Sequence, residues 1–184
     1  MNMTVHKLIK GFTRQKLLTF FFFLICNLIL PATVVGQGLS LSNNSKNTPI
    51  EILADKGIEW QKEKELLVAT GNAKASRDGV TVEAEIIRAF YRKKAKGGAD
   101  LYRIDAAGGV KVYSSKESIV GQTAVLNLDK AIFLIKGRKV KYSSKDGKII
   151  ADKQMEYWER QNIAIARGNA VATQRGKTIK ADVL

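Results

Sequence analysis

The sequence contains one stretch twice: ADKGIEWQKEKELLVATGNA (residues 54–73) and ADKQMEYWERQNIAIARGNA (residues 151–170). Extended to Ile87 and Leu184, the two copies are identical at 12 of 34 positions, all at an offset of 97 residues. Each copy runs from Ala-Asp through an apolar stretch to Gly-Asn-Ala, and then through a polar turn to a short alternating run. Such a repeat predicts a fold built from similar units.

Two weaker copies lie between these. The glycines that mark the four copies are 37, 29 and 31 residues apart in the chain: Gly71, Gly108, Gly137 and Gly168. A period near 30 residues, with two turns in each unit, predicts stacked β-hairpins that cannot bury their apolar faces alone.

Apolar and polar residues alternate in most of the chain after residue 49, as expected for strands with one buried face. The clearest runs and turns are 50–52, 80–86, 110–113, 126–128 and 140–142, with turns at 77–79, 145–147 and 174–176. We therefore expect an all-β domain of about a dozen short strands. The charged stretch 56–66 is expected to be a strand as well, because its twin contains β-formers in the equivalent positions.

The N-terminus has the pattern of a targeting segment. Basic residues precede a 14-residue apolar run at 17–30, which is shorter than the roughly 18–20 residues that span a bilayer comfortably. We expect a signal peptide at 1–36, a polar linker at 37–49 and one folded domain at 50–184. An uncleaved membrane anchor at 17–30 is the alternative.

The composition argues against an enzyme. The single Cys26 and the single His6 both lie within the expected signal peptide, so the domain has no thiol nucleophile and no histidine for a triad or a zinc site. The RGKT stretch at 175–178 lacks the earlier glycine of a phosphate-binding loop, because Val171 stands there. We expect no metal and no cofactor. Acidic residues recur at equivalent repeat positions, which favours a structural role as corner caps: Asp55, Asp152, Glu85 and Asp182.

The chain is strongly basic, with a formal net charge of +14. Lysine and arginine are scattered through nearly every unit, which disfavours nucleic-acid binding. A solvated surface remains open, and so does attraction to an anionic lipid or membrane surface through the basic runs at 92–94 and 138–141.

Many positions expected to face the interior hold small side chains, among them Val80, Ala84 and Ala172. A roll lined in this way need not fill its own interior. An apolar space of this kind suits an acyl chain, since each buried methylene contributes about 0.8 kcal/mol.

The PIEILAD opening at 49–55, the TGNA turn at 70–73 and the following Ala-acid strand together resemble the OstA-like family, and most of all its periplasmic LptA branch. The resemblance covers essentially all of 50–184. It implies an OstA-like β-jellyroll of stacked antiparallel hairpins with an apolar interior groove that shields the lipid A acyl chains of lipopolysaccharide. It also implies passage of lipopolysaccharide from inner to outer membrane, in outer-membrane biogenesis, without catalysis.

The implied partners are an LptC-type inner-membrane protein, an LptD-type outer-membrane protein, and further copies joined end to end by strand addition. The last repeat unit stops early, which predicts an unpaired sheet edge suited to such docking. Two alternatives stay open: an LptC-like anchored component, and a structural envelope protein that self-assembles without carrying lipid. The residues that we expect to contact lipid are Ile50, Ile52, Val82, Ile86, Phe90, Val112, Leu126, Leu128, Phe133 and Ile135.

Overall fold

The computed structural model describes residues 49–95 and 97–184. The expected signal peptide, the anchor alternative and all but the end of the linker lie outside the described residues. The described chain is all-β, with two single-turn 3-10 helices, η1 (Lys62–Lys64) and η2 (Glu159–Gln161). The strands are β1 (Glu51–Leu53), β2 (Gly57–Gln61), β3 (Leu66–Arg77), β4 (Val80–Lys93), β5 (Ala99–Tyr113), β6 (Glu117–Asn127), β7 (Ile132–Lys136), β8 (Val140–Ser144), β9 (Gly147–Ala151), β10 (Gln154–Trp158), β11 (Ile163–Gln174) and β12 (Lys177–Val183).

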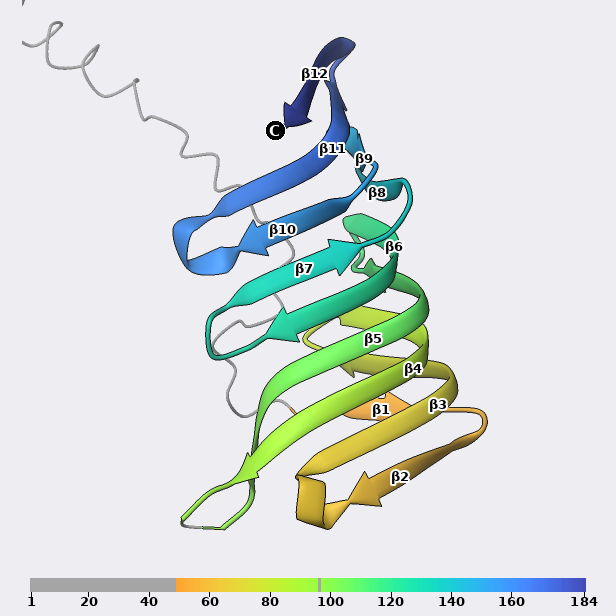
Figure 1. Cartoon of the computed structure of the whole chain (residues 1–184), viewed down its shortest axis with the longest axis vertical. Coiled ribbons are helices and arrows are strands. Elements are labelled where there is room, and N and C mark those ends of the chain that lie inside the picture. The colour runs from red at the N-terminus through yellow and green to blue at the C-terminus, as the bar shows by residue number, and fades with distance from the viewer. Residues whose placement is uncertain (1–48, 96) are drawn as a thin grey trace, which may run out of the picture. The chain divides into compact units, whose positions relative to one another are not determined.

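All twelve described strands belong to one antiparallel sheet that is bent into two layers. The long strands β3, β4, β5 and β6 curve around one side of the stack and pass from the front layer to the layer behind (Figure 1). The shorter strands β2, β7 and β10 complete the front layer, while β1, β8 and β9 complete the back layer. The expectation of an all-β jellyroll is therefore confirmed, although these four strands are longer than the sequence suggested.

The repeat is visible as repeated geometry at the corners. In the first copy, the Asp55 N–H donates to the Gly71 carbonyl at 2.8 Å, and the Asn72 side chain donates to the Asp55 carboxylate at 2.8 Å. In the second copy, the Asp152 N–H donates to the Gly168 carbonyl at 2.7 Å, and the Asn169 side chain donates to Asp152 at 3.0 Å. The aspartates therefore cap corners, as expected.

The glycines of this motif are required by their backbone geometry. Gly71 and Gly168 have φ values of +83° and +88°, and each introduces a register shift into its long strand. A β-bulge of this kind bends a strand sharply, which carries β3 and β11 around the corner of the roll.

One local expectation needs adjustment and another is confirmed. Within residues 56–66, which were expected to be a strand, 57–61 form β2, but 62–64 turn through η1 before β3 begins at Leu66, and η2 repeats this turn in the second copy. The RGKT stretch spans the Arg175–Gly176 turn between β11 and β12, as the sequence predicted.

Candidate functional site: an apolar groove between the layers

The two layers face each other with rows of small and medium apolar side chains. Because directly paired residues point to the same face of a sheet, the register of the strands defines these rows. The back layer contributes Ile52, Ala75, Val82, Val112, Ile119, Tyr142 and Ile149. The front layer contributes Ala69, Ile87, Ala106, Ala124, Ile135, Met155 and Ala166.

The middle of the groove is filled by its own side chains. The largest fully buried side chains are Ile87, Val110, Val112, Ile135 and Val140. Within the described residues, no polar or charged residue is classed as buried. This part of the interior is therefore a dry hydrocarbon core.

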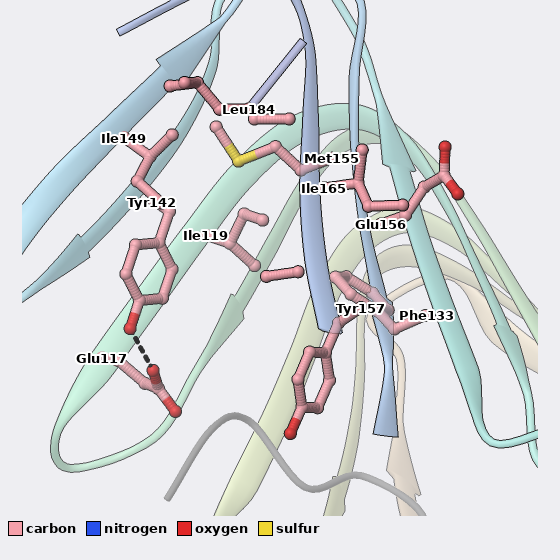
Figure 2. Close-up of a pocket in the computed structure, with 12 residues that line it drawn as sticks. Glu117, Ile119, Phe133, Tyr142, Ile149, Met155, Glu156, Tyr157, Ile165 and Leu184 are labelled. Carbon is pink, nitrogen blue, oxygen red and sulfur yellow. Dashed lines mark hydrogen bonds between the residues drawn. The ribbon is translucent and has the colours of Figure 1, made fainter. Parts of the chain in front are cut away.

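The groove opens into a cavity of about 280 Å³ at the end formed by β7, β10 and β11 in front and by β6, β8 and β9 behind. Figure 2 shows Ile119, Tyr142 and Ile149 on one side of this space and Met155, Ile165 and Tyr157 on the other. The lining is Glu117, Ile119, Phe133, Tyr142, Ile149, Met155, Glu156, Tyr157, Ala164, Ile165, Ala166 and Leu184. Such a mostly apolar space accommodates hydrocarbon rather than a charged substrate.

One polar pair lies on the wall of this cavity. The Tyr142 hydroxyl donates a hydrogen bond of 2.5 Å to the Glu117 carboxylate. Burial, together with this hydrogen bond, raises the pKa of Tyr142 to about 12. Burial also raises the pKa of Tyr157, whose hydroxyl donates to the Asn162 side-chain carbonyl at 3.0 Å. Both phenols are therefore neutral at physiological pH, and neither is a candidate general base.

Most of the residues expected to contact lipid lie in the interior. Val82, Val112, Leu126, Phe133 and Ile135 are buried in the core between the layers. Three others are partly buried and pack against that core: Ile50, Ile52 and Leu128. Their contact with lipid stays a prediction, and of the ten only Phe133 lines the cavity.

Ile86 and Phe90 lie outside the interior, because β4 steps from buried Ala84 to buried Ile87 and so reverses its alternation at the bend. On the outer face, the centre of the Phe90 ring lies 6.4 Å from that of the Tyr102 ring. The Arg103 guanidinium lies 5.7 Å from the centre of the Phe90 ring. The structure thus does not bring these two side chains to the groove.

Sequence reasoning missed most of the cavity lining. Tyr142 belongs to a short alternating run whose inward face is visible in the sequence, but Ile149 is followed by Ile150, so alternation does not show which of the two faces inward. Met155 and Tyr157 lie in the charged half of the second repeat. Their position inside follows from the pairing of β10 with β7, where Met155 faces Ile135 and Tyr157 faces Phe133.

The described residues contain no group of three or more His, Cys, Asp or Glu side chains arranged to hold a metal ion. The basic run at 92–94 is partly engaged, because Arg92 donates to Asp100 at 3.0 Å and to Asp129 at 2.7 Å. None of the helices in the described part of the chain is long and apolar enough to cross a membrane.

Comparison with known proteins supports the fold. No protein-family profile matches the chain. The structure is similar to that of LptH from Pseudomonas aeruginosa, which is the LptA-homologous periplasmic component of a lipopolysaccharide transport device. The TM-score is 0.54 and the sequence identity is 11%, and the match covers 72% of this chain and 94% of that chain. An uncharacterised protein of Rhizobium meliloti (strain 1021) is 32% identical over 108 residues, which is 56% of this chain and 56% of the relative. The chain thus spans about half the length of that curated relative, and its fold is an LptA-like β-jellyroll.

Proposed function

We propose that this protein binds the acyl chains of lipopolysaccharide in its interior groove and carries the molecule through the periplasm, without catalysing a reaction. The observation that supports this most is the apolar cavity of about 280 Å³ between the two layers. Its walls leave a space that their own side chains do not fill. Each methylene moved from water into such a space contributes about 0.8 kcal/mol.

The sheet edges support transfer along a bridge of like domains. Among the described strands, β12 pairs only with β11, and it carries exposed Ile179 and Val183. At the other end of the stack, β1 and β2 carry exposed Leu53, Ile58 and Trp60. An unpaired strand edge can accept a strand from another chain. We propose that copies join end to end and that terminal copies contact LptC-type and LptD-type partners.

The lipid-binding proposal is tested with photo-crosslinking side chains at three positions of the full chain. Ile149 and Phe133 line the cavity, whereas Leu134 neighbours Phe133 on the same strand and points to the opposite face. We expect the first two positions to capture radiolabelled lipopolysaccharide and Leu134 to capture little or none. Equal capture at all three positions, or none at the cavity positions in a folded protein, would contradict groove binding.

The remaining alternatives predict different outcomes. A structural envelope protein would assemble into oligomers yet show no capture at Ile149 or Phe133. An LptC-like component would capture lipid but keep residues 1–36 in the mature protein. N-terminal sequencing of the exported protein distinguishes the last case, since we expect mature chains to begin near Gln37.

A further inference from the structure

We propose that the outer face of the back layer, from β5 to β12, is a docking surface for a membrane rich in anionic phospholipid. This surface is separate from the groove, since it lies on the opposite side of the same strands. The proposal goes beyond lipid carriage inside the roll and does not depend on it.

The surface is defined by one continuous row of paired residues across six strands. Consecutive register pairs connect β5, β6, β8, β9, β11 and β12 in that order. The residues of this row, all pointing away from the groove, are Lys111, Val120, Lys141, Ile150, Val171 and Lys180. At roughly 4.8 Å per strand step, the three lysines extend along about 24 Å of the surface.

The neighbouring outward row adds a fourth lysine among hydroxyl side chains. Lys148 pairs with Ser143 on one side and with Thr173 on the other. The row continues as Tyr113, Ser118, Ser143, Lys148, Thr173 and Thr178. The twelve residues of the two rows therefore contain four lysines and no acidic side chain. We call these twelve residues the lysine face.

The lysines of this face are exposed, and only Lys111 has an acidic partner in the register, Glu83 on β4, whose pKa it helps to lower. Lys111, Lys141, Lys148 and Lys180 are all exposed, and no ion pair joins any of them to a described acidic residue. By contrast, Lys74 on the same layer forms an ion pair of 3.0 Å with Glu83. The positive charge is therefore concentrated between β5 and β12.

The shape and chemistry of the lysine face match a bilayer surface better than a small anion. Because Lys111 and Lys180 lie about 24 Å apart, the four lysines cannot all converge on a single phosphate. A layer of anionic headgroups, by contrast, offers a charge opposite each of them. Val120 is 44% exposed between Lys111 and Lys141 and supplies an apolar contact at headgroup depth. A basic sheet face with apolar residues between its lysines thus resembles, in its chemistry, the peripheral surfaces that bind anionic membranes.

The magnitude follows from the charge count. Each lysine close to an anionic membrane contributes a factor of about five to the partition coefficient, so the four together contribute roughly several hundredfold. This attraction falls as salt is added, because the Debye length shortens to about 8 Å at physiological ionic strength.

The test compares two full-length variants that lose the same charge. The first replaces the four lysines of the lysine face with glutamine (K111Q, K141Q, K148Q and K180Q). The control replaces four exposed lysines elsewhere: K64Q, K93Q, K130Q and K136Q. Both are measured by co-sedimentation with vesicles of phosphatidylglycerol and phosphatidylcholine, and with vesicles of phosphatidylcholine alone. The N-terminal segment is the same in every variant, so any difference between the variants arises from the replaced lysines.

We expect the lysine-face variant to bind the anionic vesicles several hundredfold more weakly than the unmodified chain, and the control to lose less than tenfold. A third variant with arginine at the four positions should retain binding. Each single glutamine variant should bind about fivefold more weakly, and these single variants test the proposal even if the fourfold variant does not fold. Equal losses in the lysine-face and control variants would overturn the proposal, as would equal binding to neutral vesicles. Equally tight binding to dextran sulfate, with the same loss in the lysine-face variant, would assign the surface to anionic polysaccharide and overturn the membrane assignment.

Failure of this proposal is distinguishable from failure of the proposed function. Photo-crosslinking at Ile149 reports on the cavity, and vesicle binding reports on the lysine face. A lysine-face variant that loses vesicle binding should still capture lipopolysaccharide at Ile149.

Discussion

Replacing Gly71 with alanine should destabilise the protein far more than the same replacement at Gly79, although both glycines have a similar backbone conformation. Their φ values are +83° and +78°. An L-residue in this left-handed region costs roughly 1–2 kcal/mol. Alanine also restricts the unfolded chain, which offsets about 0.4–1 kcal/mol of that cost. Both variants should therefore lose about 1 kcal/mol of unfolding free energy for this reason alone.

The two sites differ in what the added methyl group would contact. At Gly79 nothing lies within 4 Å of the new carbon atom. At Gly71 that atom would lie 2.5 Å from Lys56 Cγ and 2.9 Å from the Lys56 backbone nitrogen. The lysine side chain can rotate away, but the backbone nitrogen cannot move without disturbing its hydrogen bond to the Thr70 carbonyl. Forcing extra volume into such a contact typically costs 1–3 kcal/mol.

We therefore expect G71A to lose about 2–4 kcal/mol and G79A about 1 kcal/mol. Urea-induced unfolding of the two full-length variants measures both values, since their m-values should agree and only the midpoints should differ. Gly168 supplies an internal check, because its added carbon would lie 2.7 Å from Lys153 Cγ and 3.0 Å from the Lys153 nitrogen. G168A should match G71A. Losses within about 0.5 kcal/mol of each other for G71A and G79A would refute the claim that close packing at the corner requires glycine.

Three further outcomes follow from the groove and its surroundings. Truncation of fully buried Ile135 to alanine should cost about 2–5 kcal/mol in urea unfolding, and a loss below 1 kcal/mol would contradict its place in a packed core. The hydrogen bond from Arg167 holds the pKa of Glu156 below its usual value, so R167M should be less stable than the unmodified chain at neutral pH. This difference should shrink as the pH falls below the usual glutamate pKa and disappear once Glu156 is protonated in the folded state; an unchanged difference at low pH would argue against this pair. Because the pKa of Tyr142 is raised to about 12, the folded state holds this proton more tightly than the unfolded state. Its contribution to stability is therefore complete below pH 10 and declines above it, and Y142F should lose this part of the alkaline decline.

Much of the fold could be predicted because the repeated motif marks the positions at which the strands turn the corners of the roll. Gly-Asn-Ala at 71–73 and at 168–170 occupies the same conformation in both copies, down to the hydrogen bond between asparagine and aspartate. The pairing of Ala73 with Ala84 recurs as that of Ala170 with Ala181. A motif whose residues each have a specific geometric role can be interpreted without coordinates.

The inward register of the bent strands could not be predicted in the same way. In β4 the buried residues step from Ala84 to Ile87, so the alternation reverses at a bend that no glycine marks within the strand. A one-residue step of this kind moves every following side chain to the other face. This is why Ile86 and Phe90 lie outside the groove, whereas Val82, before the step, lies inside.

The cavity itself depends on the separation of the two layers, which alternation in a single strand does not encode. Ile135 and Met155 pair directly in the front layer, yet Ile135 is fully buried whereas Met155 lines the open space. The difference arises from what stands opposite each of them in the back layer. Sequence patterns identify which side chains face inward, but the facing layer determines whether they meet a neighbour or an empty volume.

The two proposed surfaces share the same strands, and the period of two along a strand keeps them apart. In β8, Tyr142 faces the groove while Lys141 faces outward, and in β9 the same holds for Ile149 and Ile150. Adjacent residues can therefore be changed with separate consequences: the inward residue alters the space available to an acyl chain, and the outward residue alters charge at a bilayer. A carrier that must both shield hydrocarbon and approach a charged membrane can meet both demands in one thin sheet, because the strands present apolar side chains to one face and four of them (β5, β8, β9 and β12) present a lysine to the other.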